Sequence, residues 1–172
     1  GLNSGHPALK VNGLLPPPDR TTTTTREIDM IYESDTLKVQ RHEGGIAELT
    51  FDLQGESVNK FNQATAQDLS AALDVLEAAD GIAGLLVTSA KPVFIVGADI
   101  TEFSSMFGAG TEAIVEFAGY NSGNFSRLEQ LPYPSVVAIN GYALGGGFEL
   151  CLSCDFRVMS TAAKVGLPET KL

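Results

Sequence analysis

The chain has 172 residues, a formal net charge of −10 at pH 7, 44% hydrophobic residues and 19% charged residues. This composition is ordinary for a globular protein of one domain with a sizeable core. The acidic balance argues against a nucleic-acid-binding function, because such binding depends on clustered Lys and Arg. The sequence shows no membrane span and no apolar core flanked by basic residues of the kind that marks a secretory signal.

Residues 1–29 differ in composition from the rest of the chain. They contain three consecutive prolines and five consecutive threonines, with no helical or strand period. Such a stretch carries too few apolar groups to offset the entropy of ordering it. We therefore expect a disordered or extraneous extension over 1–29, with Met30 as the candidate natural start and a folded domain over 30–172.

From Met30 onward, strand-like and helix-like patterns alternate. Apolar residues recur with a period of two in the strand-like segments and at helical spacing in the others. The pattern predicts strands around residues 37–39, 47–51, 82–88, 93–96 and 135–139, helices around 69–76 and 114–128, and a turn opening into a helix over 141–152. The apolar residues of 114–128, Phe117 and Phe125 among them, are expected in the core. Alternation of this kind predicts a layered α/β fold.

A run of three glycines, Gly145 to Gly147, follows the strand-like segment 135–139 and precedes Glu149. Consecutive glycines are costly in chain entropy, so they indicate a positive φ or a close approach to the backbone. The first N–H groups of the helix lack intrahelical partners and can bind a developing oxyanion. Glu149, within the first turn, adds a proton-transfer group. The alternative is a tight turn with an acidic residue near a helix start.

A second glycine turn follows the apolar run 93–96. Here Gly97, Ala98 and Asp99 could present another backbone N–H donor. Two donors would make an oxyanion hole. The alternative is an ordinary strand end in which Asp99 caps the next helix.

Four motifs, in this order and spacing, resemble the crotonase (enoyl-CoA hydratase/isomerase) superfamily: residues 94–100 (FIVGADI), 140–149 (NGYALGGGFE), 155–157 (DFR) and 166–169 (GLPE). The similarity runs from about Met30 to Leu172. Within that superfamily, residues 57–60 and 94–103 look most like the amino-terminal hydratase domain of bacterial multifunctional fatty-acid oxidation α subunits. The resemblance implies an α/β crotonase-like ββα spiral (ClpP/crotonase fold), truncated at the C-terminal end because such domains continue past this point.

The resemblance also implies a site. The backbone N–H groups of Ala98 and Gly146 match its oxyanion hole, and Glu149 and Glu169 match the two catalytic glutamates of the hydratases. Two carboxylates close together do not both ionise easily, so one can hold a proton while the other accepts one. The implied reaction is addition of water to a 2-trans-enoyl-CoA in fatty-acid β-oxidation. Δ3-Δ2-enoyl-CoA isomerisation is a second activity open to the same site.

No metal and no redox cofactor is expected, since CoA is part of the substrate. Residues 108–113 fit the dinucleotide fingerprint G-x-G-x-x-A, but no strand precedes them. Lys60 and Lys91 are candidates for the CoA phosphates, with solvated surface lysines as the alternative. The resemblance implies a homo-oligomer or, in a full-length protein, a complex with a thiolase β subunit.

Two other functions stay open. One is a catalytically inactive module for CoA-ester binding or assembly, if truncation prevents turnover. The other is a different crotonase-fold enzyme, such as a decarboxylase or a thioester hydrolase, because one oxyanion hole serves many reactions.

Cys151 and Cys154 form a C-x-x-C pair on the predicted helix. Only His6 and His42 could add imidazole ligands, and both lie far away in sequence. We therefore expect buried packing for both cysteines, and a reducing, cytoplasmic location.

Overall fold

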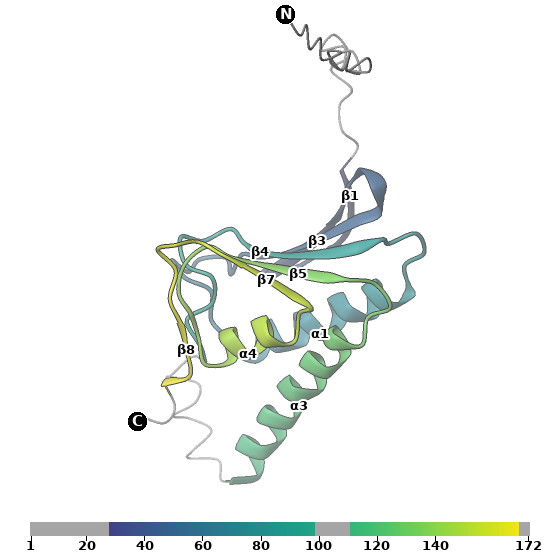
Figure 1. Ribbon diagram of the computed structural model, residues 1–172. Coiled ribbons are helices and arrows are strands. Elements are labelled where there is room, and N and C mark those ends of the chain that lie inside the picture. The colour runs from purple at the N-terminus through teal and green to yellow at the C-terminus, as the bar shows by residue number, and fades with distance from the viewer. Residues whose placement is uncertain (1–27, 99–110, 169–172) are drawn as a thin grey trace, which may run out of the picture.

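A computed structural model describes residues 28–98 and 111–168 of the chain. It consists of a twisted sheet with helices packed below it, and a pair of very short strands beside the last helix (Figure 1). The strands of the main sheet, in spatial order, are β1 (Asp29–Glu33), β2 (Leu37–Arg41), β3 (Ile46–Phe51), β4 (Gly84–Ser89), β5 (Ser135–Ile139) and β7 (Phe156–Met159). The helices are α1 (Gln63–Ala78), α3 (Thr111–Glu129) and α4 (Gly146–Leu152), with a 3₁₀ turn at Glu43–Gly45.

The direction of the strands decides where a site can form. β1, β2 and β3 are antiparallel neighbours, whereas β3, β4, β5 and β7 run parallel. The segments that leave β3, β4 and β5 therefore emerge at the same edge of the sheet. Ligands of open parallel sheets bind outside the carboxyl ends of the strands, so this edge is the place to look.

Most of the predicted elements are confirmed. Strands lie at the positions predicted around residues 37–39, 47–51, 82–88 and 135–139, and α1, α3 and α4 overlap the three predicted helices. The short strands β1 and β7, and the pair β6 (Ala143–Leu144) and β8 (Val165–Gly166), were not predicted. β6 and β8 have two residues each, and the edge strands β1 and β7 contain no buried residue, so none of the four shows a period-two pattern of buried apolar residues.

The prediction of a strand over 93–96 is wrong. This segment makes only an isolated bridge, between Ile95 and Ala143. The N–H groups of Phe94 and Ile95 both donate to the Tyr142 carbonyl, whereas Val96 donates to Asn59. Because its hydrogen bonds go to two different segments, the run cannot continue a single ladder.

Among the α3 side chains that the structure describes, those that reach the core lie in the second half of the helix. Leu128 is buried, and the Phe125 ring packs edge-on against Phe61 with ring centroids 5.5 Å apart. Phe117 is only half-buried and Ala118 is exposed. The expected core position is thus confirmed for Phe125 and Leu128 and is wrong for Ala118.

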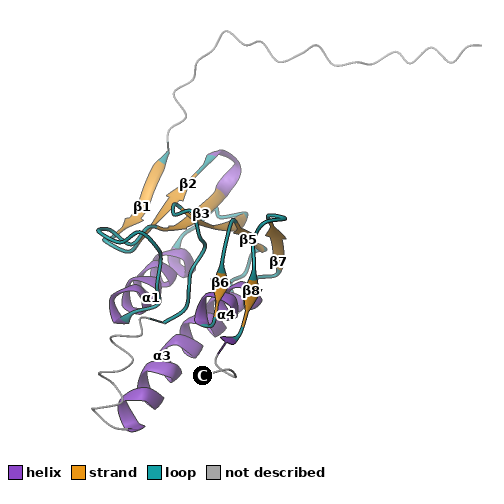
Figure 2. Ribbon diagram, turned by 90° about the vertical axis from the view of Figure 1, so that its left-hand side faces the viewer, coloured by secondary structure: helices purple, strands orange, loops and turns teal. Residues whose placement is uncertain are grey.

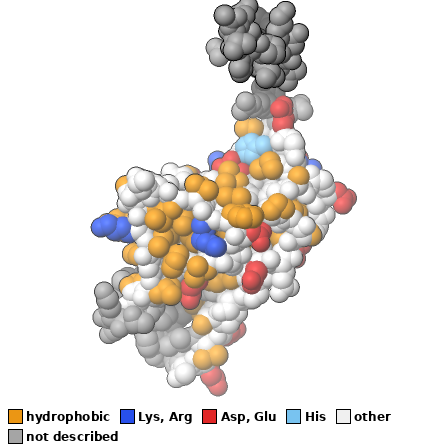
Figure 3. Space-filling view, viewed as in Figure 1, with side chains coloured by type: hydrophobic (Ala, Val, Ile, Leu, Met, Phe, Trp, Pro, Cys, Tyr) orange, Lys and Arg blue, Asp and Glu red, His pale blue; other side chains and the backbone are white. Residues whose placement is uncertain are grey.

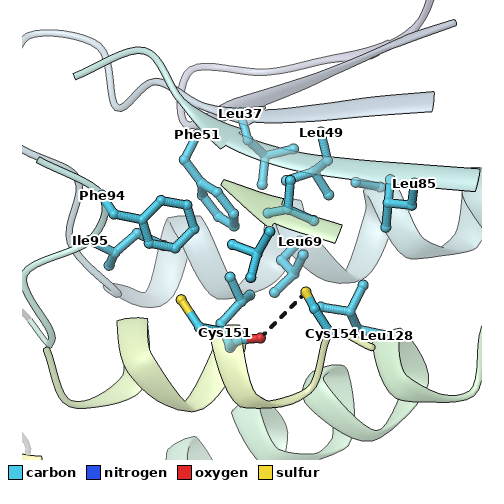
Figure 4. Close-up of a cluster of buried hydrophobic side chains, with 14 of the residues drawn as sticks. Leu37, Leu49, Phe51, Leu69, Leu85, Phe94, Ile95, Leu128, Cys151 and Cys154 are labelled. Atoms are coloured by element: carbon cyan, nitrogen blue, oxygen red, sulfur yellow. Dashed lines mark hydrogen bonds between the residues drawn. The ribbon is translucent and has the colours of Figure 1, made fainter. Parts of the chain in front are cut away.

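The core lies between the sheet and the helices (Figure 4). The sheet contributes side chains such as Leu37, Leu49 and Phe51, and α1 contributes Leu69. Cys151 of α4 and Cys154, two residues after the end of α4, complete the cluster from below as free, buried thiols. The Cys151 thiol donates to the Gly147 carbonyl at 3.1 Å and the Cys154 thiol to the Leu150 carbonyl at 3.7 Å. The expected buried packing of both cysteines is confirmed.

The far edge strand, β7, leaves apolar side chains in solvent. Phe156, Val158 and Met159 are exposed, as is Leu152 at the end of α4. Figure 3 shows hydrophobic side chains gathered over this part of the molecule. Within residues 28–98 and 111–168, no helix has the length and apolar character that crossing a membrane requires.

The buried thiols of Cys151 and Cys154 should be chemically inert. Burial raises the pKa of Cys151 and of Cys154 to about 12. At pH 8 the reactive thiolate is then on the order of one molecule in 10,000. We predict that Ellman's reagent modifies neither cysteine of the folded chain at pH 8 and modifies both once the chain is denatured. Rapid labelling of the native protein would contradict the buried placement.

The first turn of α4 packs unusually closely against the segment before it. A Cβ atom added to Gly147 would lie 2.4 Å from the Ile95 carbonyl oxygen. At the neighbouring Gly146, the nearest atom to an added Cβ would be a Phe61 ring carbon at 3.6 Å, which is ordinary contact. Of these two glycines, only Gly146 has room for a side chain.

These adjacent glycines should therefore respond differently to the same substitution. We expect Gly147→Ala to lower the free energy of unfolding by about 1–3 kcal/mol, because the backbone of two segments must move apart. Gly146→Ala should change it by less than ~0.5 kcal/mol. Denaturant titration of both variants measures the difference, and equal stabilities would show that the close packing at Ile95 is wrong.

Candidate active site

The two glycine turns singled out in the sequence lie on neighbouring segments. The N–H groups of Phe94 and Ile95 donate to the Tyr142 carbonyl at 3.0 and 3.1 Å, and the Leu144 N–H donates to the Ile95 carbonyl at 3.0 Å. The Asn140 side-chain amide donates to the Lys91 carbonyl at 2.7 Å. The segments 91–98 and 140–147 are thereby held side by side at the carboxyl edge of the sheet.

The first donor, the Ala98 N–H, is oriented by the peptide group that it shares with Gly97. The Gly97 carbonyl accepts a hydrogen bond from the Phe61 N–H at 2.8 Å. In a trans peptide the N–H points opposite to the C=O, so the Ala98 N–H points away from the Phe61 backbone. Gly97 has φ +101°, a conformation that favours glycine. Ala98 is exposed, and no acceptor within the described part of the chain takes its N–H.

The second donor, the Gly146 N–H, is oriented by the start of α4. The Gly145 carbonyl accepts from the N–H groups of Phe148 and Glu149, at 2.8 and 3.0 Å. Because this carbonyl points into the helix, the Gly146 N–H points out of its N-terminus. Among residues 28–98 and 111–168 it too has no acceptor. The sequence prediction of a helix start with bare N–H groups at this turn is confirmed.

Phe61 connects the surroundings of both donors. Its backbone forms a parallel bridge with Ala98, while a carbon of its ring lies 3.6 Å from the position that a Cβ atom on Gly146 would occupy. The sequence analysis missed this residue. A single aromatic residue in an irregular segment carries no periodic signal, so only the tertiary contacts reveal it.

Glu149 lies where the sequence predicts it, in the first turn of α4. Its Oε2 atom is 3.8 Å from the position that a Cβ atom on Gly146 would occupy. The carboxylate is therefore beside the second donor. The residue is exposed to solvent.

Glu169 lies outside the described residues, which end at Pro168. The segment before it, which includes β8 (Val165–Gly166), lies close to the start of α4, however. β8 pairs in parallel with β6, the strand that leads into α4, and the two lie side by side in Figure 2. The Gly145 N–H donates to the Gly166 carbonyl at 2.9 Å. The chain thus approaches the start of α4 three residues before Glu169.

The two candidate CoA-binding lysines lie near the same edge, each beside a carboxylate. Lys60 Nζ is 3.3 Å from Glu56, and Lys91 Nζ is 2.9 Å from Asp52. The hydrogen bond from Lys91 lowers the pKa of Asp52 below its usual value. A neighbouring carboxylate partly offsets the charge of each lysine, so the surface-lysine alternative stays open. No group of three potential metal ligands occurs within the described ranges.

The family match and the matches to known proteins agree with one another. Residues 41–172 match the enoyl-CoA hydratase/isomerase family. The fatty acid oxidation complex subunit alpha of Acinetobacter baylyi is 57% identical over 143 residues, covering 83% of this chain and 20% of the relative. The subunit of the same name from Pseudomonas paraeruginosa is 56% identical over 145 residues, with the same coverage. The chain therefore spans about a fifth of the length of these relatives.

Solved structures agree with the sequence matches. An enoyl-CoA hydratase from Bacillus anthracis superimposes with a TM-score of 0.72 at 29% identity, over 79% of this chain and 52% of that one. An enoyl-CoA hydratase/carnithine racemase from Magnetospirillum magneticum gives 0.75 at 28% identity, over 82% and 52%. The implied α/β crotonase-type fold is confirmed. With the family match over residues 41–172, these likenesses establish that the chain belongs to the enoyl-CoA hydratase/isomerase family.

Proposed function

We propose that this chain forms the amino-terminal part of an enoyl-CoA hydratase unit, which adds water to a 2-trans-enoyl-CoA in fatty-acid β-oxidation. One observation carries the proposal. Two backbone N–H groups without acceptors in the described chain, those of Ala98 and Gly146, lie on neighbouring segments with the Glu149 carboxylate beside one of them. The naming of the fatty acid oxidation relatives supports the pathway.

The two N–H groups would bind the thioester oxygen. When a nucleophile adds at C3 of an enoyl thioester, negative charge moves through C2 onto that oxygen. Donors fixed in place before the reaction stabilise this charge where it forms. Removing one donor of this kind from an enzyme typically lowers kcat by about 10²–10³-fold.

The two glutamates would move the protons. One carboxylate accepts a proton from water while the oxygen of that water bonds to C3. A proton is delivered to C2 either by the other glutamate in its acid form or by the glutamate that accepted the proton. The product is a 3-hydroxyacyl-CoA, so atoms and charge balance without a cofactor. We assign these roles to Glu149 and Glu169. Return of a proton to a different carbon would give the Δ3-Δ2 isomerase activity.

The remaining features of the proposal concern binding and context. Lys60 and Lys91 are assigned to the CoA phosphates, since both lie near the edge that carries the donors. A homo-oligomer or a complex with a thiolase β subunit is proposed for the full-length protein, because the named relatives are subunits of a complex. A cytoplasmic location suits two free, buried thiols.

A second candidate is binding of CoA esters without turnover by this chain alone. The exposure of Glu149 favours it, because a catalytic carboxylate normally works in a site that excludes bulk water. The chain also covers only 52% of the solved hydratase from Bacillus anthracis. Turnover measured on the 172-residue chain and on the full-length protein separates the two candidates.

In the full-length protein, Glu149→Gln and Glu169→Gln should each lower kcat for hydration of a 2-enoyl-CoA by at least ~100-fold, because each removes a proton-transfer group. The affinity of both variants for the acyl-CoA thioester, measured by calorimetry, should stay close to that of the wild-type protein. Glu129→Gln is the matched control, since Glu129 is an exposed carboxylate at the end of α3, and it should hydrate normally. Near-normal hydration by either active-site variant would remove that glutamate from the mechanism.

A further inference from the structure

One buried polar side chain lies behind the first donor, and it is that of Asn59. The residue is 1% exposed, although asparagine is usually found at the surface. Its Oδ1 accepts from the Leu53 N–H at 2.9 Å. Its Nδ2 lies 3.1 Å from the Phe51 carbonyl, 2.9 Å from Ser89 Oγ and 3.1 Å from the Phe94 carbonyl. Every polar atom of the amide is therefore satisfied in a position that water does not reach.

These four partners belong to different parts of the fold. Phe51 is the last residue of β3 and Ser89 the last of β4, both in the central sheet. Phe94 belongs to the irregular segment that leads to Ala98. The Asn59 side chain thus joins the ends of two central strands to a segment that forms no ladder of its own. Phe51 and Phe94 lie together at the top of the core in Figure 4.

The backbone of the same residue continues the connection toward the donor. The Asn59 carbonyl accepts from the Val96 N–H at 3.0 Å, and two residues later the Phe61 N–H donates to the Gly97 carbonyl at 2.8 Å. Residues 59–61 therefore run along residues 96–98 as a short parallel pair. The second of these bonds is the one that sets the direction of the Ala98 N–H.

We propose that Asn59 is a positioning residue for the Ala98 donor: its side-chain amide fixes residues 94–98 to the ends of β3 and β4, and so holds that N–H on the thioester oxygen. This inference rests on the proposed function, in which Ala98 binds that oxygen. The physical reason is preorganisation, because an oxyanion donor is effective only when neighbours lock it in place. An error of about 1 Å in such a site can lower the rate by about 10²-fold.

Two variants of the full-length protein test the role. Asn59→Asp keeps the shape and the acceptor for Leu53, but places an oxygen against three acceptors. Ser89→Ala leaves Asn59 in place and removes one of those acceptors, together with the hydrogen bonds of Ser89 Oγ to the Val93 carbonyl at 2.8 Å and from the Lys91 N–H at 3.1 Å. Asn124→Asp is the matched control, because Asn124 is also buried and donates to the Ala66 carbonyl at 2.9 Å, joining α3 to α1.

Two measurements separate positioning from stability. The first is kcat and KM for a 2-enoyl-CoA. The second is the infrared stretching frequency of the thioester carbonyl in bound butyryl-CoA, a saturated ligand that cannot be hydrated. Hydrogen bonds to a carbonyl oxygen lower this frequency, so it reports the donors directly. Thermal unfolding of each variant supplies the comparison.

We expect Asn59→Asp to lower kcat by about 10–100-fold with KM within about 3-fold, and to reduce the carbonyl downshift. Ser89→Ala should act in the same direction with a smaller effect. Asn124→Asp should lose thermal stability but keep both kcat and the downshift. Should Asn59→Asp fail to fold, Ser89→Ala decides the question.

A folded Asn59→Asp or Ser89→Ala variant with the wild-type carbonyl frequency and kcat would overturn the inference. So would a loss in Asn124→Asp equal to that in Asn59→Asp, since the effect would then follow stability alone. A wild-type protein that shifts the carbonyl of butyryl-CoA but hydrates no enoyl-CoA would contradict the proposed function instead. In that case the carbonyl stretching frequency of bound butyryl-CoA still tests whether Asn59 positions the Ala98 N–H.

Discussion

The contact between the Ile95 carbonyl and the first turn of α4 is the constraint on which the site depends. The carbonyl accepts a hydrogen bond from Leu144 and lies where a side chain on Gly147 would otherwise be. Only bare backbone allows the helix to begin this close to the neighbouring segment. As a result, the turn at Gly97 and the first turn of α4 lie next to each other, and each exposes a backbone N–H that has no acceptor among residues 28–98 and 111–168.

The central sheet provides the rigidity that this arrangement needs. Parallel strands β3, β4 and β5 deliver their following segments to one edge, and polar side chains at that edge tie the segments together. The donors are consequently backbone groups set by peptide planarity rather than flexible side chains. The carboxylate of Glu149, to which we assign proton transfer, is added separately, at the first turn of a helix whose N-terminus already carries partial positive charge. In the proposed mechanism, binding of charge and transfer of protons would thus come from different parts of the same turn.

Much of this arrangement could be predicted from sequence, and the limits have physical causes. The alternation around Leu49 and the helical spacing around Leu73 reflect burial on one face, so β3 and α1 were predictable. The glycine run predicted a close approach to the backbone, but it could not say that Ile95 was the approaching group. The segment 93–96 looked like a strand because its four residues are apolar, although its hydrogen bonds depend on partners distant in sequence. Phe61 was missed for the same reason, since its importance arises only from tertiary contacts.

We propose that Ala98 and Gly146 hold one thioester oxygen between them. An experimental structure of the full-length protein with a bound acyl-CoA tests this claim most directly. We expect the thioester oxygen to lie about 2.7–3.2 Å from both backbone nitrogens, with a carboxylate oxygen of Glu149 facing C2 and C3 of the acyl chain. A thioester oxygen bound to other groups, with either N–H directed elsewhere, would contradict it.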